Sequence, residues 1–353
     1  MSSIPSNTRA GEQIQSRVGD ALRDVPVCVT GGAGFIGGHL CDALLTLGAR
    51  ISIIDDLSNS DAGHIARLID TAPDRVRFVQ ASILDPRALD EAMDGVQRVF
   101  HLAALGSVPK SVEQPERTWQ VNATGTMRVL QSALRAGASR VVYSASSSAY
   151  GNNPALPKAE SMATEPESPY AAAKLAGESL CRCWAQCYGI DAISLRYFNI
   201  FGSRQAADSA YAAVIPAFIA RWVNGQAPTI FGDGEQTRDF THVSNAVLAN
   251  LLGATHPEPL GGCVVNIGAG VRTSINELAS RIRSRLGIDG LDPEHAPERI
   301  GEVRDSVANI DLARETIGYE PITDLKDGLA PTVDWYRDTL GDQHDQPGRE
   351  GAA

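Results

Sequence analysis

A tyrosine and a lysine four residues apart, Tyr170 and Lys174, are the residues of this sequence best suited to acid–base chemistry. On a helix, residues at positions i and i+4 project from the same face, with their Cβ atoms about 5–6 Å apart. A fixed ammonium beside a phenol favours the phenolate and lowers the pKa of the phenol. The spacing therefore predicts that Tyr170 acts as a general base whose pKa is lowered by Lys174. Such pairs also arise by chance on amphipathic helices, so the rest of the sequence must add evidence.

A glycine-rich segment near the start of the chain is typical of a dinucleotide-binding turn. Residues 25–30 read VPVCVT, an apolar and β-branched run that predicts a buried parallel strand. The next seven residues, GGAGFIG from Gly31 to Gly37, open onto a helical pattern that continues to residue 47. Glycines in this position let the backbone approach a pyrophosphate, which then lies at the positive end of the helix. A tight strand–helix turn without a ligand is the alternative interpretation.

Two carboxylates indicate which dinucleotide would bind. A second strand, residues 50–54, ends at Asp55 and Asp56, about twenty residues past the glycines. An acid at this spacing suits the two hydroxyls of an adenosine ribose. The same carboxylates would repel a 2′-phosphate, and no arginine follows at once. The sequence therefore predicts NAD in preference to NADP as the cofactor.

Composition narrows the class of protein. The 353-residue chain carries a net charge of −11, which makes nucleic acid an unfavourable partner. No apolar run approaches the roughly 18 residues of a membrane span, and no signal peptide is recognisable, so a cytoplasmic protein without membrane association is expected. The six cysteines lack the spacing of a metal site, so reduced thiols and no bound metal are expected. Strands alternating with helical patterns predict an α/β fold with a Rossmann-type, doubly wound parallel sheet.

Several segments together resemble one known superfamily. The segments GGAGFIG (31–37), HLAA (101–104), SSSAYG (146–151) and YAAAK (170–174) are similar to those of the extended short-chain dehydrogenases/reductases. Within that superfamily, residues 25–336 resemble the NAD-dependent nucleotide-sugar epimerases and dehydratases. The segments AALGSVP (103–109), RYFNIFG (196–202) and YAAVIP (211–216) are most similar to those of bacterial UDP-N-acetylglucosamine 4-epimerases.

The resemblance implies a domain organisation. A large NAD-binding Rossmann domain is expected over residues 25–195, with returning segments near 236–256. A smaller α/β substrate-binding lobe is expected to take up most of residues 196–340. Residues 1–24 are expected to form an N-terminal extension, as a loose helix or tail, and residues 341–353 a flexible tail. The resemblance also implies a homodimer, in which the helical segments 111–136 and 169–188 pack against their copies, although their apolar residues could equally face the protein's own core.

The resemblance assigns catalysis to Ser146, Tyr170 and Lys174. Ser146 follows a predicted strand, residues 140–144, at the edge of the sheet where ligands of open parallel sheets bind. Tyr170 would remove the proton of the sugar 4-hydroxyl while C4 passes hydride to the nicotinamide. Lys174 would hold the nicotinamide ribose, and Ser146 would hydrogen-bond the reacting oxygen. The implied cofactor contacts, besides Tyr170 and Lys174, are Gly31, Gly34, Phe35, Ile36, Gly37, Asp55, Asp56, Ser82, Ile83, Leu102, Ala103, Ala104 and Asn122.

The resemblance also implies a set of contacts to a UDP-sugar substrate. Asn199, Arg238 and Arg299 match diphosphate contacts, and planar, always charged guanidinium groups suit phosphate oxygens. Ser306 would wall the C2 substituent of the sugar, where a serine leaves room for an N-acetyl group and a tyrosine would restrict the site to plain hexoses. The full predicted set is Gly106, Ser107, Ser147, Ser148, Asn199, Ala213, Val214, Arg238, Arg299, Glu302 and Ser306. The predicted reaction is C4 epimerisation of UDP-N-acetylglucosamine through a 4-keto sugar, with UDP-glucose as a further substrate.

Three alternatives stay open at this point. The 4,6-dehydratases carry an Asp-Glu acid–base pair where this chain has Ser147 and Ser148, which cannot shuttle protons for water loss. A UDP-uronic acid 4-epimerase ranks second, because Ser146–Ser148 and Lys110 could meet a carboxylate; UDP-glucuronate enzymes, however, tend to carry a threonine where this chain has Asn199. A non-catalytic NAD-binding protein is the alternative from another class, although such proteins commonly lose the tyrosine or the lysine.

Overall fold

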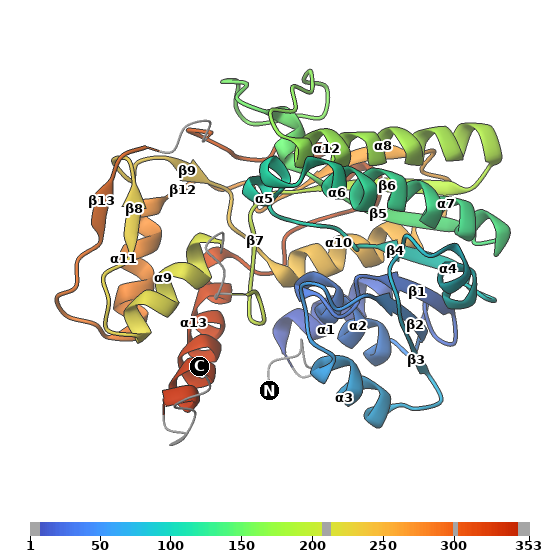
Figure 1. Cartoon of the computed structure of the whole chain (residues 1–353), viewed down its shortest axis with the longest axis horizontal. Coiled ribbons are helices and arrows are strands. Elements are labelled where there is room, and N and C mark those ends of the chain that lie inside the picture. The colour runs from blue at the N-terminus through green and yellow to red at the C-terminus, as the bar shows by residue number, and fades with distance from the viewer. Residues whose placement is uncertain (1–7, 207–212, 299–302, 345–353) are drawn as a thin grey trace.

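The computed structural model describes residues 8–206, 213–298 and 303–344, with side chains up to residue 340. A seven-stranded sheet forms the centre of the molecule (Figure 1). Its strands are β1 (Pro26–Thr30), β2 (Arg50–Asp55), β3 (Val76–Gln80), β4 (Arg98–His101), β5 (Arg140–Ser146), β6 (Asp191–Tyr197) and β11 (Cys263–Ile267). Their order is β3-β2-β1-β4-β5-β6-β11, and every pairing is parallel.

Helices cover both faces of this sheet, because successive strand residues point to opposite sides. Val27 and Val29 of β1 pack into one apolar cluster, whereas Cys28 between them packs into another. The first cluster includes α1 (Arg9–Val18), α2 (Phe35–Thr46), α3 (Gly63–Thr71), α10 (Val243–Thr255) and α12 (Asp311–Ile317). The second includes α4 (Pro86–Ala92), α7 (Gly125–Arg135) and α8 (Pro169–Tyr188). The predicted doubly wound α/β sheet is confirmed, and its strand order reverses between β1 and β4, which is where such sheets bind ligands.

A smaller lobe lies to one side of the sheet (Figure 1). Its apolar core joins α9 (Val214–Val223), α11 (Ile275–Leu286), α13 (Leu325–His344) and β8 (Thr229–Phe231). Short pairings complete the structure: β8 with β13 (Glu294–Ala296), β9 (Thr237–Arg238) with β12 (Thr273–Ser274), and β7 (Ile200–Phe201) with β10 (Thr241–His242). Because α10 packs on the sheet and β11 extends it, the part of the chain that returns to the Rossmann domain reaches beyond the predicted residues 236–256.

The helical segment predicted over residues 111–136 is interrupted in the structure. It contains the end of α5 (Val108–Glu113), then α6 (Pro115–Trp119), one π-helical turn η1 (Gln120–Thr124) and α7. Gln114 leaves the helical region, with φ −131° and ψ 62°. Proline explains the break, since it disfavours the helical conformation of the residue before it.

The N-terminal segment is packed onto the main domain instead of forming a loose helix or tail. Helix α1 buries Ile14 and Val18 and contacts α10. The Arg17 guanidinium donates hydrogen bonds to the carbonyl oxygens of Gly318 (2.6 Å) and Glu320 (3.2 Å). At the other end, α13 continues to residue 344, so most of the predicted flexible tail lies outside the described residues. Across the described residues, no helix combines the length and the apolarity needed to cross a bilayer.

Candidate active site

A crevice opens beyond the carboxyl ends of β1, β2, β3 and β4, at the point where the strand order reverses. Of the predicted cofactor contacts, the structure brings Gly31, Gly34, Asp55, Asp56, Ser82, Ile83, Leu102, Ala103 and Ala104 together around it. Other lining residues are Ile54, Ser58, Asn59, Ser60, Ala81, Leu105, Arg117 and Val121. Four strand ends therefore contribute to one elongated site of the kind that binds dinucleotides.

The turn after β1 requires glycines for steric reasons. Gly31 has a positive φ of 74°, and a Cβ atom there would lie 2.6 Å from the backbone nitrogen of Ala103. A Cβ atom on Gly37 would lie 2.1 Å from the carbonyl oxygen of Gly31. The turn is thus packed directly against the segment after β4 and against the first turn of α2. The first amides of a helix have no partners within the helix, so the start of α2 is suited to a pyrophosphate, and the residues present fit NAD.

Replacing Gly37 by alanine is expected to weaken NAD binding by at least about tenfold, because the new methyl group displaces the backbone of Gly31. Calorimetric titration of the cofactor-stripped protein with NAD measures this. Gly38→Ala is the matched control in the same helix: its Cβ would lie 3.2 Å from the ring of His64, which is a contact with a side chain and not with the backbone. Equal NAD affinity of the two variants would contradict the role given to Gly37.

A buried chain of hydrogen bonds supports the floor of the crevice. Thr126 Oγ1 donates to the carbonyl of Asn122 (2.6 Å) and so accepts from Nε2 of His101 (2.9 Å). The Nδ1 atom of His101 then accepts from Thr30 Oγ1 (2.7 Å), which in turn accepts from the amide of Ala103 (3.2 Å). Burial lowers the pKa of His101 to about 3, so the ring stays neutral in this chain of bonds. Sequence reasoning quoted His101 within a motif but missed this supporting role.

Two of the predicted cofactor contacts, Asp55 and Asn122, form hydrogen bonds with the protein's own backbone. Asp55 accepts from the amides of Ala33 (3.0 Å) and Leu57 (2.9 Å), which ties the glycine-rich turn to the end of β2. Burial raises the pKa of Asp55, and these hydrogen bonds oppose that rise. Asn122 is buried and pairs its amide with the backbone of Leu105, at 2.8 Å and 3.1 Å. Asn122 therefore holds in place the loop at Leu105, which lines the crevice, without lining the crevice itself.

Three hydroxyl groups meet at the carboxyl end of β5. Ser146 is the last residue of that strand, and its oxygen accepts from the amide (3.2 Å) and from the hydroxyl (2.9 Å) of Ser148. A serine hydroxyl has two acceptor sites and one hydrogen. Both acceptor sites of Ser146 are used in this way, which leaves its hydrogen to donate, and the Ser146 hydroxyl acts to lower the pKa of Tyr170. Tyr170 lies in the first turn of α8, which Ser168 caps by accepting from the amide of Ala171 (3.1 Å).

Burial opposes the predicted effect of Lys174 on the pKa of Tyr170. Lys174 is buried, and its ammonium donates to the carbonyl of Ser144 (2.7 Å) and lies 5.1 Å from the centre of the Tyr143 ring. Burial raises the pKa of Tyr170, and only the hydrogen bond with Ser146 opposes that rise. Burial also lowers the pKa of Lys174 to about 8, although the nearby Glu178 carboxylate acts against this. The sequence predicted the spacing of the pair correctly, but it carries no information on how deeply the two side chains are buried.

Glu178 is a further residue that sequence reasoning missed. It lies one helical turn beyond Lys174 and is almost fully buried. Its carboxylate accepts two hydrogen bonds from the Arg196 guanidinium, at 2.9 Å and 2.7 Å. The available signal was its position in the sequence, four residues after a lysine on the same helix face.

Comparison with known proteins agrees with this geometry. The sequence profile of the NAD-dependent epimerase/dehydratase family matches residues 27–268. The chain belongs to this family. It is an NAD-dependent enzyme, and the predictions of family and cofactor are confirmed.

Individual members of the family show how similar the chain is. It is 38% identical to the UDP-glucose 4-epimerase of Mycolicibacterium smegmatis over 311 residues. This match covers 88% of this chain and 97% of the relative. It superposes with a TM-score of 0.84 on a UDP-N-acetylglucosamine 4-epimerase from Methanobrevibacter ruminantium, at 36% identity over 90% of this chain and 99% of the other. A dTDP-glucose 4,6-dehydratase from Streptomyces venezuelae, solved with NAD bound, gives a TM-score of 0.82 at 30% identity over 90% and 98%.

The predicted substrate contacts of this family member lie on several segments. Asn199 is exposed between β6 and β7, Ala213 and Val214 begin α9, and Gly106 and Ser107 precede α5. Arg238 and Ser306 are far apart in sequence but close in space, because the Ser306 amide donates to the carbonyl of Thr237 (3.1 Å). Ser147 lies beside Ser148 on the 3₁₀-helix η2 (Ser147–Tyr150). Arg299 and Glu302 lie outside the described residues.

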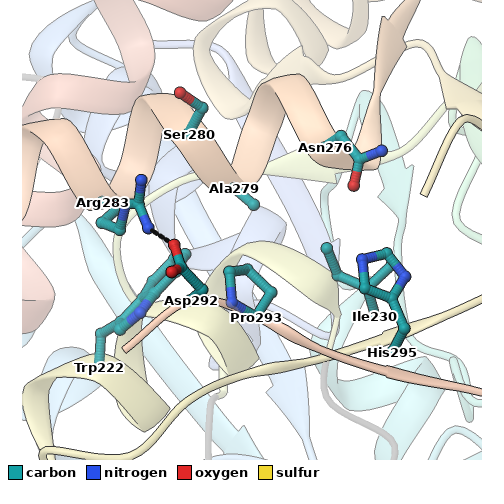
Figure 2. A pocket seen from close by; sticks show the side chains of 9 residues that line it. All are labelled: Trp222, Ile230, Asn276, Ala279, Ser280, Arg283, Asp292, Pro293 and His295. Atoms are coloured by element: carbon teal, nitrogen blue, oxygen red, sulfur yellow. Dashed lines mark hydrogen bonds and ion pairs between the residues drawn. The ribbon is translucent and has the colours of Figure 1, made fainter. Parts of the chain in front are cut away.

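A second cavity in the C-terminal lobe is separate from these residues. It lies between α9, α11 and the β8–β13 pair (Figure 2) and contains none of the predicted contacts. Trp222, Ile230 and Ala279 form its apolar part, and an ion pair between Arg283 and Asp292 crosses its edge. Among the described residues, no group of three or more histidine, cysteine or carboxylate side chains is placed to hold a metal ion.

Proposed function

We propose that the protein is a UDP-sugar 4-epimerase that interconverts UDP-N-acetylglucosamine and UDP-N-acetylgalactosamine. The observation that carries the proposal is the hydroxyl group at the end of β5, where Ser148 donates to Ser146 and Ser146 in turn acts to lower the pKa of Tyr170. It offers one acid–base group at the reaction centre and places hydroxyls, not carboxylates, at positions 147 and 148. A dehydratase needs further acid–base groups for water loss, so this set favours epimerisation. The epimerases among the similar proteins support the same choice.

Bound NAD would supply a nicotinamide that takes up hydride and returns it. The protein's own part is proton transfer and charge stabilisation. Tyr170 would take the proton of the sugar 4-hydroxyl and give it back when the hydride returns to the opposite face of the 4-keto sugar. Ser146 would donate to the oxygen of Tyr170 and stabilise the negative charge that develops there. Lys174 would add a buried positive charge at the carbonyl of Ser144, two residues before Ser146.

The assignment of an N-acetylated sugar rests on the side chain at position 306. Ser306 is partly buried, and its backbone is hydrogen-bonded to the residue that precedes Arg238. If Arg238 holds the diphosphate, as proposed, then Ser306 lies on the backbone segment next to it. A small side chain there leaves space for an N-acetyl group at C2.

Replacing Ser306 by tyrosine is expected to spare the epimerisation of UDP-glucose and to lower kcat/KM for UDP-N-acetylglucosamine by about 10²-fold or more, because the phenol fills the space of the N-acetyl group. Steady-state rates with both sugars measure the ratio. Ser306→Ala, which keeps the space open, is the control and should retain both activities. A tyrosine variant with unchanged activity on the acetylated sugar would remove Ser306 from the wall of the sugar site.

The proposed activity is tested by proton NMR of purified protein with UDP-N-acetylglucosamine and no added NAD. Appearance of UDP-N-acetylgalactosamine, and its loss in Tyr170→Phe, supports the proposal. If the sugar does not change even when NAD is added, the proposal is overturned. The same sample with UDP-glucuronate then tests the uronic acid alternative, which Lys110 and the serines at 146–148 favour.

Homodimerisation and a cytoplasmic location stay predictions. Four apolar side chains of α5, α6 and α8 are exposed and could meet a second copy: Val108, Val112, Trp119 and Tyr188. Leu130 of α7, in contrast, is buried in the protein's own core.

A further inference from the structure

Residues 304–306 are joined to the strand that carries Arg238 by backbone hydrogen bonds. The amide of Thr237 donates to the carbonyl of Arg304 (3.1 Å), and the amide of Ser306 donates to the carbonyl of Thr237 (3.1 Å). Arg238 adds a bond from its own guanidinium to the carbonyl of Arg304 (3.1 Å). The two side chains proposed to meet the diphosphate and the sugar are therefore held on adjacent segments of backbone.

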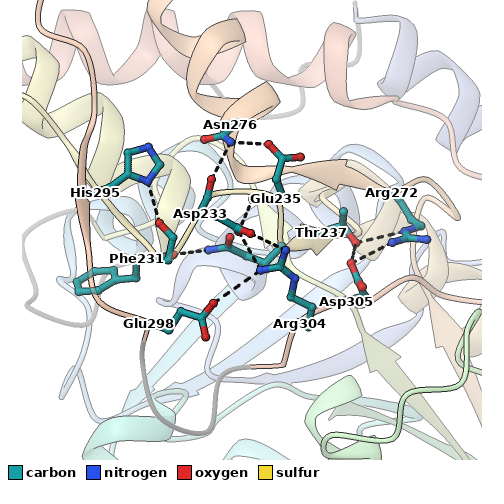
Figure 3. Close-up of polar contacts among 12 residues, drawn as sticks. Phe231, Asp233, Glu235, Thr237, Arg272, Asn276, His295, Glu298, Arg304 and Asp305 are labelled. Carbon is teal, nitrogen blue, oxygen red and sulfur yellow. Dashed lines mark hydrogen bonds and ion pairs between the residues drawn. The ribbon is translucent and has the colours of Figure 1, made fainter.

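An ion pair secures one side of this junction (Figure 3). The Arg304 guanidinium donates two parallel hydrogen bonds to the Asp233 carboxylate, both of 2.8 Å. Arg304 lowers the pKa of Asp233 to about 2, so the carboxylate is charged over the whole working range of pH. Asp233 also accepts from the amide of Glu235 (2.9 Å), which shapes the loop leading into β9. The pair thus links that loop to residue 304.

A second group secures the other side (Figure 3). Thr237 Oγ1 donates to the Asp305 carboxylate, which also accepts from the Arg272 guanidinium (3.0 Å). Arg272 donates in addition to Thr237 Oγ1 (3.2 Å). Arg272 precedes β12, and β12 pairs with β9 at Arg238. Strand β9, which carries Arg238, therefore contacts residues 304–306 on one side and β12 on the other. The two groups of side chains hold these segments together.

We propose that Asp233, Arg304, Asp305 and Arg272 form a clasp whose role is to position Arg238 and Ser306 against the UDP-sugar. The inference rests on the proposed function and adds four positioning residues to it. The clasp side chains are 30–53% exposed, so their ion pairs contribute little to the stability of the fold. A bidentate arginine–carboxylate pair does, however, fix orientation. Loss of the clasp should therefore weaken substrate binding without unfolding the lobe.

The test compares the NAD-loaded full-length protein with Arg304→Gln and Asp305→Asn. Arg281→Gln is the matched control, because it removes an exposed ion pair, with Glu277, from α11 of the same lobe. We expect each clasp variant to raise the dissociation constant of UDP and the KM for UDP-N-acetylglucosamine about three- to fivefold, with kcat unchanged within about twofold. The melting temperatures should match that of the control. Asp233→Asn combined with Arg304→Gln should be no worse than either single variant, because both remove one interaction.

The outcomes separate the clasp from the proposed function. If the wild-type protein epimerises the sugar and the clasp variants match Arg281→Gln in KM and UDP affinity, the clasp is overturned and the function stands. If the variants lose UDP affinity but the wild-type protein epimerises no acetylated sugar, the clasp stands and the function fails. A wild-type protein that does not bind UDP overturns both. A fall in kcat with unchanged KM would place these residues in catalysis and also contradict positioning.

Discussion

Replacing Tyr170 by phenylalanine is expected to lower the rate of epimerisation by about 10²–10⁴-fold, because the proton of the 4-hydroxyl loses its acceptor. The crevice around the glycine-rich turn does not depend on the phenol oxygen, so the NAD content of the purified variant should equal that of the wild-type protein. Single-turnover rates and the NAD released on denaturation measure the two quantities. Residual activity within about tenfold of wild type would assign the proton transfer to another group.

The pH dependence provides a sharper test of the same residue. Burial raises the pKa of Tyr170, so the phenolate fraction is small at neutral pH and increases as the pH rises. The rate should therefore increase with pH until Lys174, whose pKa is about 8, begins to lose its charge. Ser146→Ala removes the donor that opposes the rise, so the pKa goes up further and the profile should shift to higher pH. Ser148→Ala keeps the Ser146 hydroxyl and serves as the control, with a smaller shift expected. A shift to lower pH in Ser146→Ala would contradict the effect of this hydroxyl on the pKa of Tyr170.

Replacing Glu178 by glutamine is expected to move the alkaline limb of the pH–rate profile to lower pH. The buried Lys174 has a pKa of about 8, and the Glu178 carboxylate acts against the lowering caused by burial. Without that negative charge, the pKa of Lys174 should fall further. The ammonium is present below its pKa and is lost as the pH rises through it, so activity that needs the charge should disappear at lower pH than in the wild-type protein. The rate measured between pH 6 and pH 9, at roughly half-unit steps, locates the limb.

A second buried ion pair provides a control that separates the expected effect on Lys174 from a general loss of stability. Removing one partner of a buried pair costs about 3–5 kcal/mol of stability whatever its role. Arg140 and Asp191 form such a pair (2.5 Å) at the amino ends of β5 and β6, away from Lys174. Asp191→Asn should therefore lose comparable stability without shifting the pH profile. Arg196→Met, which leaves the Glu178 carboxylate without its partner, should shift the limb of Lys174 to higher pH. Identical profiles for Glu178→Gln and Asp191→Asn would show that Glu178 is only structural.

The parts of the site that sequence reasoning predicted correctly are those set by local backbone. The turn at Gly31 and the strand ending at Asp55 follow from residue type and spacing alone, and the structure places both at the same crevice. Spacing likewise put Tyr170 and Lys174 on one helix. Spacing carried no information on how deeply the two side chains lie, and burial reverses the expected direction of the pKa of Tyr170.

Contacts between distant segments were equally beyond the sequence. Asp233 and Arg304 are 71 residues apart, and neither stands in a pattern that points to the other. The interruption at Gln114 had a visible signal, the proline that follows it, which the prediction of one helical segment over residues 111–136 did not take into account. The packing of helix α1 had a weak signal in the sequence, since Ile14 and Val18 are spaced to lie on one face of a helix.

The path of the chain between the sheet and the lobe limits how substrate preference can change within such a protein. After β6 the chain enters the lobe at α9, returns for α10 and β11, enters it again at α11, and returns once more for α12 before ending in α13. The lobe is therefore not an inserted cassette that recombination could exchange in one piece. A swap would need matched junctions at every passage. Divergence of substrate preference in this architecture is consequently expected to proceed through single substitutions on the lobe's inner surface, with the cofactor half left intact.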